Sequence, residues 1–249
     1  MPDVRQDEIW DQDAAERYDT EDEGMFAPEV LGPTVERLAQ LAEGGRALEF
    51  AIGTGRVAVP LSRRGVPVAG IELSEPMIGR LRTKADESTI PVVVGDMATT
   101  RAPGSFQLVY LVYNTISNLL TQAEQIECFR NAARHLRPGG RFVIELWVPE
   151  LPPRPPAAQV VVYHDEPGYL GMDTFDVVNQ QIVSHHFRFD ESKQARLTRS
   201  PHRYIWPAEL DLMARIAGFE LESRHGDWSG GDFTASSSSH ISVYRLPED

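Results

Sequence analysis

Residues Ala47–Val57 read ALEFAIGTGRV, a strand-like segment followed by a glycine turn. It begins as a short apolar strand, carries one carboxylate at Glu49, and breaks into Gly53-Thr54-Gly55 before the helix-like segment RVAVPLSRRG. Glycines between a strand and a helix let a ligand approach the backbone closely and leave helix N–H groups free to meet it. A tight turn without a ligand has the same pattern, so the turn alone does not identify a site.

Strands and helices alternate up to about residue 150. The predicted strands are RALEF, VPVAGIEL, IPVVVGDM, FQLVYLVY and RFVIELWV. Their low internal polarity predicts a parallel sheet covered by helices on both faces, which is an α/β fold. Capping signals predict helices after Ser74, after Thr121 and from Pro33, and Gly139-Gly140 is expected to separate a helix from the fifth strand.

The pattern changes after Pro149. PELPPRPPAA is rich in proline and predicts a stiff linker. Segments from AQVVVYH to ARLTRSPHRYIW alternate as strands do and predict an inserted antiparallel sheet over roughly residues 157–205. The helix PAELDLMARIA and the strands FELESRH and SHISVYRL follow. We expect a cap segment and ligand-binding core in residues 1–150, the inserted sheet as a substrate lid in 151–205, and the completion of the core in 206–249.

Composition limits the possible partners. The chain of 249 residues has 37 acidic and 24 basic residues and a net charge of −13, which predicts no nucleic-acid partner because phosphate backbones are repelled. A single cysteine, Cys128, excludes an internal disulfide, and no apolar stretch approaches the length of a membrane span. With an acidic N-terminus that lacks the core of a signal peptide, these features predict a cytoplasmic protein without a membrane partner. We expect a monomer or homodimer.

The acid before the glycine turn separates two kinds of ligand. Gly53, Gly55 and Ala58 match G-x-G-x-x-A, and Glu72 lies where a ribose-binding acid is expected, so an NAD(P)-dependent oxidoreductase is one alternative. Glu49 argues against it, because an acid near the turn would repel a diphosphate. A ligand that is cationic at this point and lacks phosphate fits better. S-adenosylmethionine, with its sulfonium and ammonium groups, is such a ligand.

Two more acids end the next strands along the chain. Glu72 ends VAGIEL, where a carboxylate can accept both ribose hydroxyl protons. Asp96 ends VVVGDM, where it can accept from an adenine amino group with the backbone of Met97 beside the ring. HLRPGGRFVIEL then supplies a helix stop and a fifth strand at the expected distance.

Taken together, these segments resemble the class I S-adenosylmethionine-dependent methyltransferases over roughly residues 45–150, and small-molecule N- and O-methyltransferases in particular. The resemblance implies a Rossmann-like, doubly wound, seven-stranded, mostly parallel sheet with an antiparallel sheet inserted after the fifth strand. It implies that Glu49 lies near the methionyl end of the cofactor, Glu72 holds the ribose and Asp96 reads the adenine. Ala51 stands where the family commonly has glycine. The residues expected to bind the cofactor are Tyr18, Glu49, Ala51, Gly53, Gly55, Glu72, Leu73, Met77, Asp96, Met97 and Leu111.

The reaction implied by the resemblance is in-line methyl transfer from S-adenosyl-L-methionine to a nitrogen or oxygen of a small molecule, with S-adenosyl-L-homocysteine as product. Alignment and exclusion of water supply most of the rate, so neither a catalytic triad nor a metal is required. The adjacent residues His164-Asp165-Glu166 lack the spacing of a metal-ligand set, and no metal is expected. A non-catalytic regulator that binds S-adenosylmethionine is a further alternative.

Four residues are candidates for contact with the reacting groups. Tyr18 lies on the N-terminal segment and either faces the sulfonium or packs in an amphipathic helix. Asn118 follows the fourth strand and either binds the acceptor or caps a loop. His185 and His186 alternate along one strand, so one of the two can face the pocket. Asp227 lies in a glycine-flanked loop and is a candidate acid.

Overall fold

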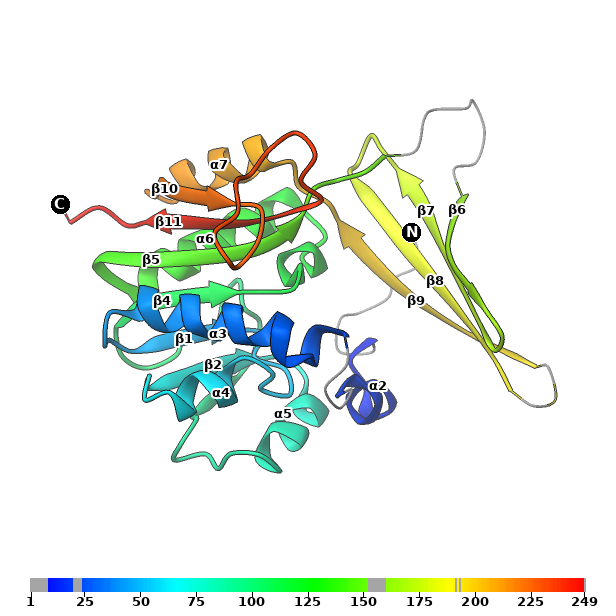
Figure 1. Ribbon diagram of the computed structural model, residues 1–249, viewed down its shortest axis with the longest axis horizontal. Coiled ribbons are helices and arrows are strands. Elements are labelled where there is room, and N and C mark those ends of the chain that lie inside the picture. Colours follow the sequence, from blue (N-terminus) through cyan, green and yellow to red (C-terminus); the bar gives the residue numbers. More distant parts are fainter. Residues whose placement is uncertain (1–8, 20–23, 152–159, 191, 193, 249) are drawn as a thin grey trace.

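The computed structural model describes residues 9–19, 24–151, 160–190, 192 and 194–248. Within these residues it contains a seven-stranded sheet flanked by helices and a four-stranded antiparallel sheet that projects from one end of the core (Figure 1). This is the predicted α/β fold with an inserted sheet. In the part of the chain that is described, no helix is long and apolar enough to cross a membrane.

The large sheet has the strand order β10-β11-β5-β4-β1-β2-β3. Strands β1 to β5 run parallel, and β11 is antiparallel to both β5 and β10, as the family resemblance implied. Strands β2 and β3 are added on one side of β1, and β4 and β5 are added on its other side. The strand order therefore reverses between β1 and β4, which is a topological switch point. The strands are β1 Ala47–Phe50, β2 Val68–Glu72, β3 Val92–Val94, β4 Phe106–Leu111, β5 Leu136–Trp147, β10 Glu220–His225 and β11 Ser239–Arg245.

Two helices begin at the side-chain caps that the sequence predicted. The Ser74 side chain accepts the Met77 N–H at the start of α5, and Thr121 with Glu124 forms a complete capping box at the start of α6, which confirms both predictions. The α-helices are α2 Gln12–Tyr18, α3 Pro28–Ala42, α4 Ala58–Arg63, α5 Glu75–Arg82, α6 Gln122–His135 and α7 Pro207–Ile216, with 3₁₀ turns η1 Gly24–Phe26 and η2 Thr115–Asn118.

Two predicted boundaries were wrong. Helix α3 begins at Pro28, which occupies the favourable first turn, and Pro33 lies inside the helix. There it removes only one intrahelical hydrogen bond, a loss that burial of the helix face offsets. Helix α6 ends at His135 and β5 follows at once, so Gly139 and Gly140 lie within the strand. Gly139 has φ +77°, and the β4–β5 register shifts nearby, which indicates an irregular strand start.

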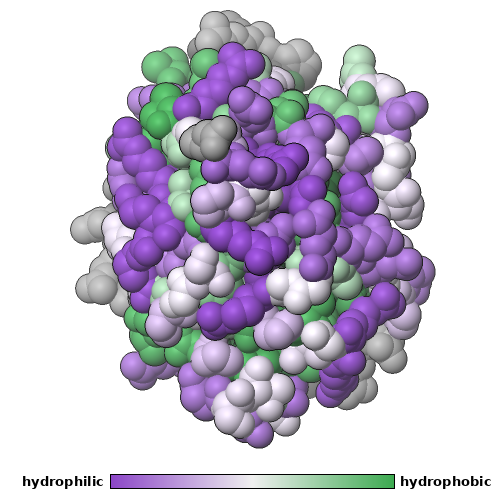
Figure 2. Space-filling model, turned by 90° about the vertical axis from the view of Figure 1, so that its left-hand side faces the viewer, coloured by the Kyte–Doolittle hydropathy of each residue, from purple (hydrophilic) through white to green (hydrophobic). Residues whose placement is uncertain are grey.

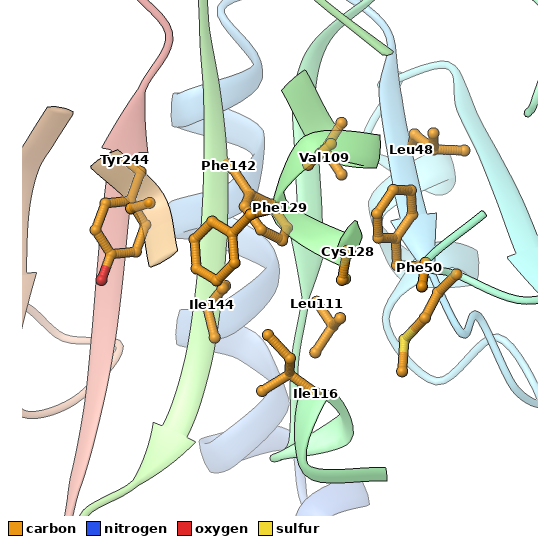
Figure 3. Packing of buried hydrophobic residues seen from close by; sticks show 14 of the residues in the cluster. Leu48, Phe50, Val109, Leu111, Ile116, Cys128, Phe129, Phe142, Ile144 and Tyr244 are labelled. Atoms are coloured by element: carbon orange, nitrogen blue, oxygen red, sulfur yellow. The ribbon is translucent and has the colours of Figure 1, made fainter. Parts of the chain in front are cut away.

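The core consists of two apolar layers, one on each face of the large sheet. Alternation along β1 directs Leu48 and Phe50 toward α6 and α7, and directs Ala47 toward α3 and α4. On the first face the rings of Phe129 and Phe142 pack edge to face with centroids 5.2 Å apart (Figure 3). Figure 2 shows the end of the molecule opposite the inserted sheet, where coloured hydrophobic groups are scattered among hydrophilic ones without a broad apolar patch.

The inserted sheet has the order β6-β7-β8-β9, with antiparallel pairing throughout. It lies between β5 and α7 in the chain and beside the N-terminal helix α2 in space, where Asp13 of α2 pairs with Arg196 of β9 at 2.6 Å (Figure 1). Most of the predicted proline-rich linker lies outside the described residues. The strands are β6 Val160–Glu166, β7 Tyr169–Asp176, β8 Gln181–Phe189 and β9 Ala195–Arg203.

Candidate functional site

A cavity of about 620 Å³ lies at the carboxyl ends of β1 to β5. Open α/β sheets bind ligands at this edge, next to the topological switch point. One side is formed by the loops after the strands, with Gly53, Glu72 and Asp96 among them. The opposite side is formed by the N-terminal segment and by the inserted sheet, through residues such as Tyr18 and Asp173. The cavity therefore joins three regions that are far apart in the sequence.

The two glycines of the turn after β1 have different roles. Gly53 lines the cavity in a left-handed conformation with φ +57°, and a Cβ there would meet no side chain. Gly55 also has a positive φ, of +81°, but a Cβ there would lie 2.3 Å from Cδ1 of Leu81 in α5. Gly55 therefore permits close packing of the turn against α5 and does not itself line the cavity.

Glu72 connects the glycine turn to the second strand. Its Oε2 accepts the Gly53 N–H at 2.8 Å, and its Oε1 accepts the Ser74 N–H at 2.8 Å. Burial raises the pKa of Glu72, while these backbone donors act in the opposite direction. A carboxylate offers about four lone pairs, and its backbone donors do not use all of them, so Glu72 keeps acceptor capacity for a hydroxyl donor in the cavity. The side chain is held in place before any ligand binds.

Asp96 occupies the corresponding position after β3. Its Oδ1 accepts the Ala98 N–H at 2.6 Å, and the residue lines the cavity together with Met97. The bond to Ala98 orients the carboxyl group and leaves the second oxygen for a donor. Glu72 and Asp96 thus present two oriented acceptors on one wall of the cavity.

Glu49 does not line the cavity. It is 3% exposed, and alternation along β1 directs it to the face covered by α3 and α4, where Tyr110 donates to its Oε2 at 2.8 Å. Burial raises the pKa of Glu49 to about 8, so the side chain is mostly protonated at neutral pH. The charge from which the repulsion of a diphosphate was predicted is therefore reduced in the ligand-free protein, and the expected place of Glu49 near the methionyl end of the cofactor stays a prediction.

Three residues without glycine's freedom adopt left-handed backbone conformations around the cavity. Ala51 has φ +51°, Tyr113 has φ +54° and Asn114 has φ +63°. Glu145 Oε2 accepts the Tyr113 N–H at 2.7 Å, and Asn114 Oδ1 accepts the Trp147 N–H at 2.7 Å. Strained conformations of this kind persist where surrounding contacts stabilise them and are concentrated at functional sites.

The N-terminal segment is attached to the rim of the cavity. Tyr18 lines the cavity and packs edge to face against Trp10, with ring centroids 5.8 Å apart. Ser74 Oγ donates to the Trp10 carbonyl at 2.6 Å, and Thr54 Oγ1 donates to Asp19 at 2.6 Å. Burial raises the pKa of Tyr18 to about 12, so its hydroxyl keeps its proton at neutral pH. Tyr18 therefore both packs in the segment and faces the cavity.

The structure brings most of the expected cofactor-binding residues to this cavity, but not all. Glu49, Gly55 and Leu111 are outside its lining, and Leu111 is buried in the core between β4 and α6. Sequence position near a strand end did not reveal which way each side chain points. The expected residues that line the cavity are Tyr18, Ala51, Gly53, Glu72, Leu73, Met77, Asp96 and Met97.

Of the four candidates for contact with the reacting groups, Tyr18 and Asn118 line the cavity. His185 does not, because Ser184 lines the cavity and the next residue on the strand points to the opposite face. Asp227 does not either. Its Oδ1 accepts the N–H groups of Ser229 at 2.8 Å and Gly231 at 3.0 Å, so it stabilises its own loop.

Several cavity residues of the inserted sheet were missed. Asp173, Phe175, Ile182, Ser184 and His202 line the cavity from β7, β8 and β9. Alternation in each strand was visible in the sequence, but it could not show which face meets the core. In the described part of the chain, no group of three or more His, Cys, Asp or Glu residues is placed to hold a metal ion.

Comparison with known proteins agrees with this geometry. A family model described as "Methyltransferase domain" matches residues 47–140. The chain is 29% identical to a cypemycin N-terminal methyltransferase from Streptomyces sp over 244 residues, which cover 92% of this chain and 94% of that protein. It is 31% identical to a dTDP-3-amino-3,4,6-trideoxy-alpha-D-glucopyranose N,N-dimethyltransferase from Streptomyces venezuelae over 42% of this chain and 44% of that protein.

A solved structure extends the likeness to nearly the whole chain. The CcbJ methyltransferase from Streptomyces caelestis is 35% identical, with a TM-score of 0.82, over 95% of this chain and 96% of that one. The match includes the inserted sheet as well as the core. The chain belongs to the class I S-adenosylmethionine-dependent methyltransferase family.

Proposed function

We propose that this protein methylates a nitrogen or oxygen of a small molecule, with nitrogen preferred, and releases S-adenosyl-L-homocysteine. The observation that carries the proposal is the pair of oriented carboxylates, Glu72 and Asp96, at the ends of two neighbouring strands on one wall of a cavity of about 620 Å³. A cavity of this size suits a cofactor together with a small acceptor.

The chain's residues fit S-adenosyl-L-methionine in charge and shape. Glu72 has free lone pairs for the two ribose hydroxyls, and Asp96 has a free oxygen for the adenine amino group. Leu73, Met77 and Met97 offer apolar contact to the adenine ring. The backbone at Ala51 and Gly53 and the hydroxyl of Tyr18 are left for the methionyl end. Glu49 is assigned no direct contact.

The charge of the cavity supports nitrogen as the acceptor atom. Among the described residues that line it there is neither lysine nor arginine, whereas four carboxylates are present. Such a surface disfavours anionic acceptors and favours groups that are cationic or become so. Of the relatives named above, one is an N-terminal methyltransferase and one an N,N-dimethyltransferase of an amino sugar nucleotide by their printed names. The four carboxylates belong to Glu72, Asp96, Glu150 and Asp173.

The bound cofactor supplies an activated methyl group on its sulfonium. The residues of this chain then orient the acceptor and keep water from the reacting atoms. Tyr18 and Asn118 line the cavity, which supports their proposed contact with the reactants. We further propose that residues 151–205 act as the substrate lid, because β7, β8 and β9 form the wall opposite the strand ends.

Calorimetric titration with S-adenosyl-L-methionine and S-adenosyl-L-homocysteine tests the proposal. We expect one site and a loss of affinity of roughly a hundredfold to ten-thousandfold in Glu72→Ala, since two hydrogen bonds to a charged group are removed. Glu36→Ala, whose side chain is exposed, should show no change. Failure of both ligands to bind at millimolar concentration, or equal binding by Glu72→Ala and wild type, would refute it. Tight binding without labelled product from a pooled set of amines and alcohols would instead indicate a non-catalytic regulator.

A further inference from the structure

One face of the inserted sheet contributes a row of side chains to the cavity. On β7 these are Asp173 and Phe175, and on β8 they are Ile182 and Ser184. The strand register pairs Asp173 with Ser184 and Phe175 with Ile182, and it pairs Ile182 with His202 on β9. Polar and apolar groups are therefore placed at fixed positions on a regular, hydrogen-bonded surface, which orients a ligand more accurately than a loop does.

Asp173 is the charged residue of this row, and one of its oxygens has no partner. Within the described part of the chain, Oδ1 is buried and makes no hydrogen bond. Burial raises the pKa of this carboxyl, and the hydroxyl of its cross-strand neighbour Ser184 acts in the opposite direction. A buried carboxylate oxygen without a donor is costly, and most such groups in native proteins have a partner. A donor supplied by a ligand would remove that cost.

The surroundings of Asp173 contain no fixed cation on the cavity side. None of the described lining residues is lysine or arginine. His202 lines the same wall, but burial lowers its pKa to about 4, so it is neutral at pH 7. His185, the cross-strand partner of Met172, points to the other face of the sheet but is near enough to lower the pKa of Asp173. The charge of Asp173 is therefore available to a cationic group that enters the cavity.

Apolar groups line the same cavity as this carboxylate. Phe175 and Ile182 lie on the same face of the inserted sheet as Asp173, and Trp147 lines the cavity from the end of β5. A ligand that satisfies both parts of the wall has an amino group for Asp173 and a compact apolar or aromatic body for the side chains beside it. An anionic ligand would meet the carboxylate without a compensating cation.

We propose that Asp173 binds the amino group of the methyl acceptor, and that the acceptor is an amine carried on an apolar or aromatic body. This inference rests on the proposed function above. In the transfer the nitrogen lone pair forms the N–C bond while the C–S bond breaks and its electron pair stays on sulfur. The nitrogen becomes cationic and then loses a proton to water. Asp173 accepts an N–H of the acceptor and stabilises the positive charge that develops there.

The test uses the full chain saturated with S-adenosyl-L-homocysteine and three probes of one shape: benzylamine, benzyl alcohol and benzoate. Calorimetry should show that wild type binds benzylamine at least tenfold more tightly than either of the other two. The Asp173→Asn variant, which keeps the size of the side chain, should lose at least tenfold in benzylamine affinity while its affinity for S-adenosyl-L-homocysteine stays within twofold. Asp165→Asn, an exposed acid of β6 in the same sheet, should match wild type.

Equal benzylamine binding by wild type and Asp173→Asn would overturn the proposal, as would benzoate binding as tight as benzylamine binding or no amine binding up to 10 mM. If Asp173→Asn also loses S-adenosyl-L-homocysteine, the comparison of the three probes on wild type decides. Failure of the proposed function has a different signature, because wild type would then not bind S-adenosyl-L-homocysteine at all.

Discussion

Glu49 makes a sharp prediction about stability and pH. Its pKa is raised from 4.5 to about 8 by burial in the folded protein. In the unfolded chain the carboxyl ionises near 4.5, so between pH 4.5 and pH 8 the folded state binds more protons than the unfolded state. The free energy of unfolding therefore falls as pH rises through this window, and the loss is complete above pH 8.

The size of the effect follows from the shift. At about 1.36 kcal/mol per pKa unit, the contribution of Glu49 reduces the free energy of unfolding by about 3 kcal/mol at pH 7 and by less than about 1 kcal/mol at pH 5. The substitution Glu49→Gln removes this loss and keeps an oxygen that can accept the Tyr110 hydroxyl. We expect the ligand-free variant to be more stable than wild type at pH 7 by about 3 kcal/mol, or roughly 6 °C in melting temperature for a chain of this length.

Urea unfolding of wild type and Glu49→Gln at pH 5, 7 and 8.5 measures this. The two proteins should be close at pH 5 and should diverge as pH rises. Tyr110→Phe is the matched control, because it removes the hydrogen bond that lowers the pKa of Glu49. Its stability should be lower throughout, and its loss of stability with rising pH should remain and extend to higher pH. If Glu49→Gln and wild type lose stability in parallel from pH 5 to 8.5, the assignment of a protonated, buried Glu49 is incorrect.

Three further predictions concern the cavity rim. Ala51→Gly should raise the free energy of unfolding by about 0.5–1 kcal/mol, because φ +51° is strained for alanine, and a lower melting temperature would contradict this. Gly55→Ala should lower the free energy of unfolding by roughly 1–3 kcal/mol, because the new Cβ would lie 2.3 Å from Cδ1 of Leu81. Gly79→Ala on the open side of α5 should not lower it. Similar urea midpoints for the two variants would refute this explanation. His185→Gln should leave cofactor affinity and turnover within twofold of wild type, since the residue points away from the cavity; a tenfold loss of turnover would place it in the site.

Much of the fold could be predicted because its signals are local. Apolar strands separated by capped helices predict a parallel α/β sheet whatever the detailed packing, and the caps at Ser74 and Thr121 are present as expected. Helix ends were less predictable. A proline is compatible with both a first turn and a tolerated interior position, which is why α3 begins at Pro28 and contains Pro33.

The candidate site was predicted where strand order alone places residues together. Parallel strands bring their carboxyl ends to one edge, so Glu72 and Asp96 had to lie near each other once the sheet was recognised. Side-chain direction at a strand end depends on the twist and on what covers each face. Glu49 points to the face covered by α3 and α4 for this reason, and burial there raises its pKa, neither of which its position in the sequence reveals.

The sheet, its glycine turn and the two acids that face the cavity follow from local patterns in the sequence, because periodicity, capping and motif spacing depend only on neighbours along the chain. Which face of the inserted sheet meets the core depends on packing between distant segments, and this packing encloses Asp173 and His202 in the cavity and leaves His185 outside it. Alternation divides the side chains of a strand into two sets, and the packing of distant segments decides which of the two sets is enclosed.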